Sequence, residues 1–289
     1  MEKRVWVAGE ALVDLMRSGD SEVASVGGGA ANTARALVKL GIKTSFIGGI
    51  SNDDYGLMIA SEFADVDLSL SRKVALPTAL ANHHVAEDGS ASYTFGVEGT
   101  ATFDFSGDWL PALSPEVLHI GSLSTIIEPG ASTLFDWAKD LSATIVYDPN
   151  VRPSFLADKD EYRQLVERWI GISKIVKLSS EEMSWLGYLD TRRFFDLGAQ
   201  FVVVTHGAKG MTGLTKYGSV DVPGVKTSVV DSVGAGDTVG AVLVEALVKY
   251  GFDELVKSRL FEVLRRAAKA AAITCSRVGA NPPTLAELE

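Results

Sequence analysis

Short apolar runs recur along the chain, and most are followed by a longer stretch with helical spacing of apolar residues. The runs lie at residues 5–9, 43–48, 117–121, 144–147, 175–178 and 201–205 and predict strands. The run at 5–9 contains no polar residue and predicts a strand that is buried on both faces. Repeated strand–helix units predict an α/β fold in three layers, with a mostly parallel, Rossmann-like central sheet between helices.

The pattern changes between residues 65 and 105. Short alternating runs at 79–85 and 92–95, with a Glu-Asp-Gly-Ser turn at 87–90 between them, predict an antiparallel hairpin. We expect a small sheet outside the main layers, formed by about 65–105 and a segment near 12–26, within one domain that spans 1–289. This sheet suits a lid over a substrate crevice, a contact between the subunits of a homodimer, or both.

Composition and charge exclude several classes of protein. The single cysteine, Cys275, excludes an intramolecular disulfide and a Cys-rich zinc site. The four histidines show no metal-ligand spacing, and we expect them to be surface or hydrogen-bonded structural residues. A net charge of -10 argues against nucleic-acid and membrane partners. Without an apolar run of the roughly 20 residues that a membrane span needs, or a signal-peptide pattern, the expected location is cytoplasmic.

A glycine-rich turn stands before the apolar helix predicted from residue 235. Gly234, Ala235 and Gly236 precede Asp237. Small residues let backbone N–H groups approach an anion, and a helix N-terminus adds about half a positive charge. An acid at this point suits a general base for a hydroxyl that attacks a phosphoryl group. The competing interpretation is an ordinary acidic residue in the first turn of a helix.

Other predicted strand ends carry polar or glycine residues. Asp14 follows the first strand, Gly28, Gly29 and Asn32 lie before and within the next helix, and Arg152 follows the strand at 144–147. Ligands of open α/β sheets bind at the carboxyl ends of strands. A turn residue and a flexible loop with ordinary capping are the alternatives for Asp14 and for the glycines. The Walker, dinucleotide-binding and protein-kinase motifs are all absent from the sequence.

Three separated motifs resemble those of the PfkB-type carbohydrate kinases in the ribokinase-like superfamily, with bacterial fructokinases the most similar in pattern. The motifs are Gly-Gly-Gly-Ala-Ala-Asn at 27–32, Asp-Pro-Asn-Val-Arg at 148–152, and Asp-Ser-Val-Gly-Ala-Gly-Asp at 231–237. The last has Ser232 where the family signature has threonine. The resemblance covers nearly the whole chain and implies phosphorylation of a sugar by ATP with Mg²⁺.

The resemblance also implies a role for each motif residue. Asp237 would be the base, and the turn 234–236 would form an anion hole for the transferred phosphoryl group. Sugar hydroxyls would contact Asp14, Gly28, Gly29 and Asn32, with Arg152 near the sugar or phosphate. The nucleotide-binding residues would be Lys177, Ser179, Glu182, Thr205, Gly207, Gly210, Gly234 and Gly236.

Metal sites follow from the same resemblance. Glu182 would act on Mg²⁺, through water, in a segment where Ser179 replaces the family's asparagine. Many relatives bind a monovalent cation at positions that match Asp231 and Val233, beside the loop near Gly279. Pro283 stands where a hydroxyl ligand often lies, so dependence on K⁺ stays open.

We expect fructose as the substrate, from the motifs at 9–14, 98–101, 148–152 and 275–283. The alternatives are 2-keto-3-deoxygluconate, whose acid group would want an additional basic residue, and then ribose, nucleosides or aminoimidazole riboside. A non-catalytic sugar-binding protein on the same fold would lack Asp237 or the glycines, both of which are present. A nicotinamide-dependent oxidoreductase would need the missing dinucleotide fingerprint.

Overall fold

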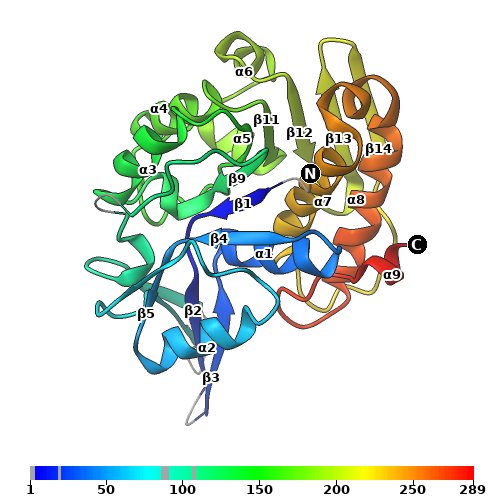
Figure 1. The fold of residues 1–289 in the computed structure, drawn as a ribbon. Helices are drawn as coiled ribbons and strands as arrows, with labels where there is room; N and C mark the ends of the chain where they lie inside the picture. Colours follow the sequence, from blue (N-terminus) through cyan, green and yellow to red (C-terminus); the bar gives the residue numbers. More distant parts are fainter. Residues whose placement is uncertain (1–3, 19–20, 86–90, 106–108) are drawn as a thin grey trace.

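The computed structural model describes residues 4–18, 21–85, 91–105 and 109–289 (Figure 1). An eight-stranded sheet in the order β14-β13-β12-β11-β10-β9-β1-β4 forms its centre. Its parallel strands are β1 (Val5–Ala8), β4 (Thr44–Ile47), β9 (Val117–Gly121), β10 (Thr144–Asp148), β11 (Ile175–Ser179) and β12 (Phe201–Thr205). The antiparallel strands β13 (Gly210–Thr215) and β14 (Gly218–Pro223) complete one edge. The predicted mostly parallel α/β sheet is confirmed.

Alternate residues of the central strands enter two separate apolar cores. Val5 and Val7 of β1 belong to one core, whereas Trp6 and Ala8 belong to the other. The first core is covered by α1 (Gly29–Lys39), α7 (Ala235–Glu254) and α8 (Leu260–Cys275), which follows a π-helical turn at Leu255–Arg259. The second is covered by α3 (Gly130–Ala138), α4 (Lys159–Ile170), α5 (Ser180–Leu186) and α6 (Arg192–Leu197). Because helices cover both faces of the sheet, its central strands carry mostly apolar residues on both faces.

A four-stranded sheet lies beside this layer structure, at the bottom of Figure 1. Its order is β3 (Ser21–Gly27), β2 (Leu12–Ser18), β7 (Leu80–Val85) and β8 (Ala91–Gly96). The pairs β2–β3 and β7–β8 are antiparallel, and β2–β7 is parallel. The sheet thus joins the segment near 12–26 to the predicted hairpin. The turn predicted at 87–90 lies outside the described residues.

Short elements complete the chain and include several that periodicity did not predict. They are α2 (Asp54–Glu62), α9 (Leu285–Leu288), and the parallel pair β5 (Gly49–Ser51) and β6 (Arg72–Val74). The apolar helix predicted from residue 235 runs to Glu254 and passes across a non-helical Gly251. The strands β5 and β6 and the helix α9 are too short to show a periodic pattern and were therefore not predicted.

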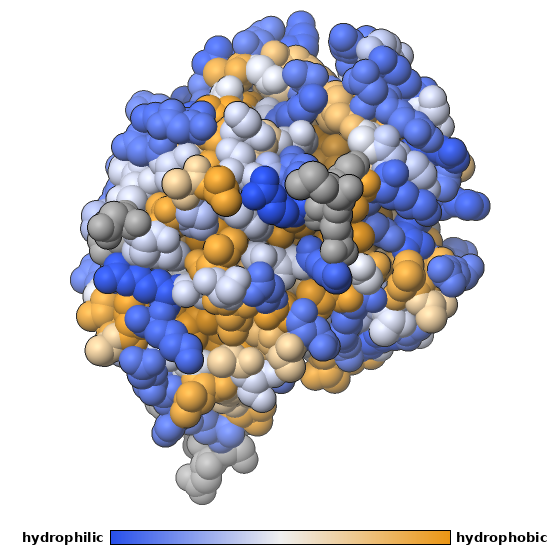
Figure 2. All heavy atoms as spheres, in the orientation of Figure 1, coloured by the Kyte–Doolittle hydropathy of each residue, from blue (hydrophilic) through white to orange (hydrophobic). Residues whose placement is uncertain are grey.

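The surface of the molecule separates by hydropathy in the orientation of Figure 1. Hydrophilic residues gather over the outer helices, while hydrophobic residues gather over the lower half, where β2, β5 and α2 lie (Figure 2). None of the described helices combines the length and apolar character needed to cross a bilayer.

Candidate active site

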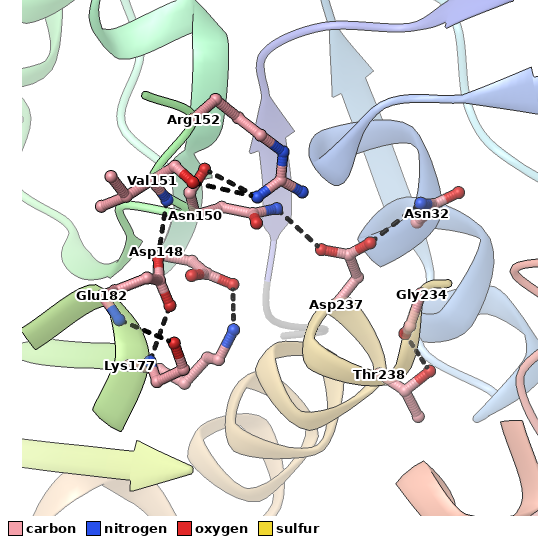
Figure 3. Close-up of polar contacts among 11 residues, drawn as sticks. Asn32, Asp148, Asn150, Val151, Arg152, Lys177, Glu182, Gly234, Asp237 and Thr238 are labelled. Atoms are coloured by element: carbon pink, nitrogen blue, oxygen red, sulfur yellow. Dashed lines mark hydrogen bonds and ion pairs between the residues drawn. The ribbon is translucent and has the colours of Figure 1, made fainter. Parts of the chain in front are cut away.

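The parallel strands end at one edge of the central sheet, and the N-termini of α1 and α7 lie at the same edge. Asp148 ends β10, Ser179 ends β11 and Thr205 ends β12. Asn32 lies in the first turns of α1 and Asp237 in the first turn of α7, and Figure 3 shows them facing each other across the site. Residues far apart in the sequence therefore meet where open α/β sheets bind ligands.

Asp237 is a buried carboxylate held by amide groups. The Asn32 Nδ2 donates a hydrogen bond to Asp237 Oδ2 at 2.8 Å, and Asn150 Nδ2 lies 3.5 Å from Oδ1 (Figure 3). Only 7% of the residue is exposed. The amides fix the orientation of the carboxylate.

Burial and, secondly, the charge of Asp148 raise the pKa of Asp237 to about 6, against the opposing effects of Lys177, Asn32 and Arg152. A carboxyl group with this pKa is mostly ionised at neutral pH, yet it is more basic than an exposed aspartate. This combination suits proton abstraction near neutral pH.

The turn before α7 has a conformation that requires glycine. Gly234 has φ 77°, and a Cβ there would lie 2.6 Å from Ala280 Cβ. Thr238 Oγ1 donates to the Gly234 carbonyl at 2.9 Å. The Ala235 N–H donates to the Ser232 carbonyl at 3.3 Å. The amides that follow in the first turn have no acceptor inside the helix, because the first N–H groups of any helix lack one. Such amides can bind an anion.

Lys177 and Asp148 form a buried ion pair beside Asp237. The Lys177 Nζ lies 2.6 Å from Asp148 Oδ2, and both side chains are about 5% exposed or less. Burial by itself lowers the pKa of Lys177, but the charges of Asp148, Glu182 and Asp237 outweigh it and raise the pKa. A Cβ on Gly236 would lie 2.9 Å from Nζ, so the glycine lets the ammonium reach the start of α7.

The glycine loop before α1 is fixed by a residue that sequence patterns did not assign to the site. Glu10 is fully buried and accepts hydrogen bonds from the Gly29 N–H at 2.9 Å and from Ser124 Oγ at 2.6 Å. Gly28 has φ 103°, and a Cβ there would lie 2.6 Å from the Glu10 carbonyl oxygen. Glu10 lies two residues after the end of β1, and this position near a strand end is the sequence signal for its role.

Asp14 and Arg152 reach the site from different elements. The prediction that Asp14 stands at the carboxyl end of the first strand is wrong, because β1 ends at Ala8 and Asp14 lies within β2 of the smaller sheet. Its Oδ2 lies close to Gly27, where a Cβ would be only 2.0 Å away. The Arg152 guanidinium is exposed and donates to the carbonyls of Asn150 and Val151 at 3.3 and 3.2 Å.

Glu182 has a clear structural role at the start of α5. Its two oxygens accept the Ser179 N–H and the Val151 N–H, each at 2.6 Å, and Ser179 Oγ accepts the Glu182 N–H in return. This capping box joins β11 and α5 to the chain that follows β10.

A cavity of about 960 Å³ opens beside this cluster. Its wall includes most residues predicted to bind nucleotide, namely Lys177, Ser179, Glu182, Thr205, Gly207, Gly210 and Gly236, together with Arg152 and Ala235. Gly234 is not part of the wall. Small residues of α8, among them Ala271 and Ala272, line the cavity and were not predicted. Small side chains on an otherwise apolar helix were the available signal for them.

Asp231 connects the turn before α7 to the loop near Gly279. Its Oδ1 accepts the Val233 N–H at 3.0 Å and its Oδ2 accepts the Gly279 N–H at 2.9 Å. The segments predicted to surround a monovalent cation are therefore adjacent. In the described part of the chain, no group of three or more His, Cys, Asp or Glu side chains is arranged to hold a metal ion.

His119 differs from the expectation that each histidine lies at the surface or is hydrogen-bonded. It is buried in β9, and neither ring nitrogen has a hydrogen-bond partner among the described residues. Burial, with the charge of Lys177, lowers its pKa to about 3. A Cβ on Gly240 would lie 2.9 Å from Nε2, so α7 packs closely over the ring. The imidazole is neutral at neutral pH.

Comparison with known proteins identifies this arrangement. The model of the pfkB family carbohydrate kinases matches residues 6–287. A fructokinase of Rhizobium leguminosarum bv. trifolii is 37% identical over 260 residues, which cover 84% of this chain and 79% of the relative.

Solved structures agree with the family match. Fructokinase from Xylella fastidiosa with bound ATP superposes with a TM-score of 0.90 at 25% identity, covering 100% of this chain and 97% of that one. Fructokinase from Vibrio cholerae O395 in its fructose, ADP and calcium ion bound form gives a TM-score of 0.84 at 27% identity, covering 96% and 94%.

The fold and the family match are those of a sugar kinase with a ribokinase-like architecture. The chain belongs to the pfkB family of carbohydrate kinases, and its curated relatives include fructokinases.

Proposed function

We propose that this protein is a fructokinase, which transfers the γ-phosphoryl group of ATP to a hydroxyl of fructose with Asp237 as the general base. The observation that carries this proposal is the buried Asp237 carboxylate, with its raised pKa, at the N-terminus of α7 and beside the large cavity. The similarity to fructokinases over most of both chains supports the choice of sugar.

In this mechanism Asp237 takes the proton of the attacking hydroxyl. Asn32 and Asn150 hold the carboxylate so that it faces the hydroxyl. The first-turn amides that follow Ala235 at the turn 234–236, together with the Lys177 ammonium, balance the charge on the phosphoryl group as it moves. Phosphoryl transfer depends mainly on such positioning and charge balance, and a base contributes about 10²- to 10⁴-fold.

The nucleotide would occupy the large cavity, which the small residues Gly207, Gly210 and Ala272 leave open. Thr205 offers a hydroxyl at the end of β12, and Arg152 offers cationic N–H donors to sugar or phosphate. We call this space the nucleotide cavity.

ATP would arrive as its Mg²⁺ complex. The two Glu182 oxygens already accept backbone N–H groups, so this side chain fits a contact to the metal through water, using its remaining lone pairs. The buried Asp148 Oδ1 has no hydrogen-bond partner among the described residues and is a further acceptor in the cluster. K⁺ at Asp231 and Val233 remains a proposal that the adjacent Gly279 loop supports.

Sugar hydroxyls would meet Asp14, Gly28, Gly29 and Asn32, with the smaller sheet acting as a lid of the single domain 1–289. The alternative substrate, 2-keto-3-deoxygluconate, would place its carboxylate near a cation, and Arg152 is an exposed cation in the cavity wall. An uncharged sugar needs no such partner.

A coupled assay of ADP release with Mg·ATP tests the function. The panel contains fructose, 2-keto-3-deoxygluconate, ribose, aminoimidazole riboside and a nucleoside. We expect the highest kcat/KM with fructose. A higher kcat/KM with 2-keto-3-deoxygluconate would show that this acid is the substrate instead of fructose. A lack of turnover with the whole panel would rule out the proposed function.

The lid also supports a homodimer. Met16 of β2 and Val23 of β3 are cross-strand partners, and they are 56% and 61% exposed. Apolar residues exposed on a small sheet suit contact with a second copy. Light scattering should give a dimer mass that Val23→Lys converts to the monomer mass; a monomer at all concentrations would contradict the proposal.

A further inference from the structure

Arg35 on α1 connects three parts of the molecule that meet at the site. Its Nη2 lies 2.9 Å from Asn32 Oδ1, 3.4 Å from the Val26 carbonyl oxygen and 3.4 Å from the Ala280 carbonyl oxygen. Its Nη1 lies 3.1 Å from Glu62 Oε2 on α2, and the arginine side chain is only 16% exposed. Guanidinium groups have several donors in a fixed plane, which suits contacts with several acceptors.

The contact with Asn32 determines which way its amide faces. An amide has an oxygen that only accepts and a nitrogen that only donates. Arg35 can only donate and the ionised Asp237 can only accept, so Oδ1 must face Arg35 and Nδ2 must face Asp237. A reversed amide would place two acceptors against each other at Asp237.

Through Ala280, Arg35 also contacts the loop that packs against the turn before Asp237. Ala280 packs on Gly234 so closely that a Cβ on that glycine would lie 2.6 Å from the alanine Cβ. Arg35 therefore touches both the amide that holds Asp237 and the loop that packs against the turn before it.

We infer that Arg35 is a positioning residue of the phosphoryl-transfer reaction, which holds Asn32 in the orientation that donates to the catalytic base. The inference rests on the proposed role of Asp237. Arg35 touches no reacting atom, and its effect passes through Asn32.

The charged groups around Asp237 and Arg35 determine how the loss of Arg35 should change the pKa of Asp237. Asp148 from β10, Lys177 from β11 and Arg152 also act on the Asp237 carboxylate. Glu62 faces Arg35 from α2, and Lys39 and Arg277 are nearby cations. Loss of a hydrogen bond to an ionised carboxylate should raise the pKa of Asp237 by about one pH unit.

The test compares Arg35→Met with a matched control. For Arg35→Met, we expect the acid limb of kcat/KM for the sugar to move up by about one pH unit, with a rate loss of about fivefold at pH 6 and under about twofold at pH 8. Glu62→Gln removes the exposed partner of the same arginine and should leave the limb in place. An unshifted limb in a folded Arg35→Met protein would overturn the inference.

Arg35→Lys separates geometry from charge. An ammonium cannot reproduce the planar set of donors, so we expect a shift in the same direction as for Arg35→Met. A wild-type profile in Arg35→Lys would show that charge alone acts, and it would overturn the orienting role. In an Asn32→Ala background, Arg35→Met should cause no additional shift, because the contact that transmits its effect is already lost.

A titration that needs no turnover keeps this test independent of the proposed function. The Asp237 carboxyl signal is followed by ¹³C NMR and assigned with Asp237→Asn. Failure of all sugars to react would remove the kinase assignment, yet the predicted rise of the Asp237 pKa in Arg35→Met could still be observed. An unchanged titration would overturn the inference by itself.

Discussion

The base side and the nucleotide side of the site are built in different ways. Around Asp237, buried polar side chains are paired with one another, as in the Asn32–Asp237 hydrogen bond and the Lys177–Asp148 ion pair. The nucleotide cavity touches Lys177 as well, but much of its wall consists of small residues such as Gly207, Gly210, Ala271 and Ala272. The base side is closed and interconnected, whereas the nucleotide side is open.

This difference predicts which single substitutions should have the largest effects on rate and stability. Removal of one member of a buried polar pair leaves its partner unsatisfied in a medium that stabilises charge poorly. A wall residue of an open cavity can be replaced at the cost of one contact. We therefore expect large effects on rate and stability at the base side, and small effects limited to nucleotide affinity at the other.

The largest effect should come from Asp237→Asn. The amide retains the shape of the side chain but cannot accept the hydroxyl proton, so kcat should fall by about 10²- to 10⁴-fold or more. Calorimetry should show nucleotide affinity within about threefold of wild type, since the cavity wall is unchanged. A kcat near that of wild type would refute the role of Asp237.

Lys177→Met should have the next largest effect, on stability. It leaves the buried Asp148 without its cation, which typically costs about 3–5 kcal/mol in free energy of unfolding. Urea denaturation measures this loss. Arg192→Met removes the exposed partner of Asp190 and should leave the free energy of unfolding nearly unchanged. Equal losses in the two variants would contradict the comparison.

Two glycines with similar backbone angles compare the two sides directly. Gly234 has φ 77° and Gly207 has φ 57°, so alanine at either costs about 1–2 kcal/mol in strain. Only at Gly234 would the Cβ meet another residue, Ala280, which adds about 1–3 kcal/mol. Thermal unfolding should thus show a larger loss for Gly234→Ala than for Gly207→Ala; the reverse order would contradict the packing described here.

The smallest effect should come from Thr205→Val in the wall of the nucleotide cavity. Loss of one neutral hydrogen bond corresponds to about 0.5–1.5 kcal/mol, so KM for ATP should rise by about 2- to 12-fold. KM for the sugar and the free energy of unfolding should stay near wild type. A large fall in kcat with unchanged KM for ATP would place Thr205 in the chemistry instead.

Sequence patterns predicted the two sides unequally. The layers and the central strands follow from local signals, because apolar runs predict strands and glycines mark turns at strand ends. Thr205, Gly207 and Gly210 of the cavity wall were predicted from the resemblance of their turn to that of the kinase family.

The pairing on the base side depends on contacts between distant residues. Asn32 and Asp237 are 205 positions apart, and Glu10 and Ser124 are 114 apart. No periodic pattern reports which buried polar groups meet. Glu10 and Arg35 were therefore missed, and Asp14 was placed on the wrong strand.

The pH dependence of kcat/KM for the sugar tests the central claim most directly. The base must be ionised to accept a proton, and burial and the charge of Asp148 raise the pKa of Asp237 to about 6. The rate should therefore rise with pH through an apparent pKa near 6 and reach a plateau above it. A profile that stays flat from pH 5 to pH 8 in the folded enzyme would contradict the account.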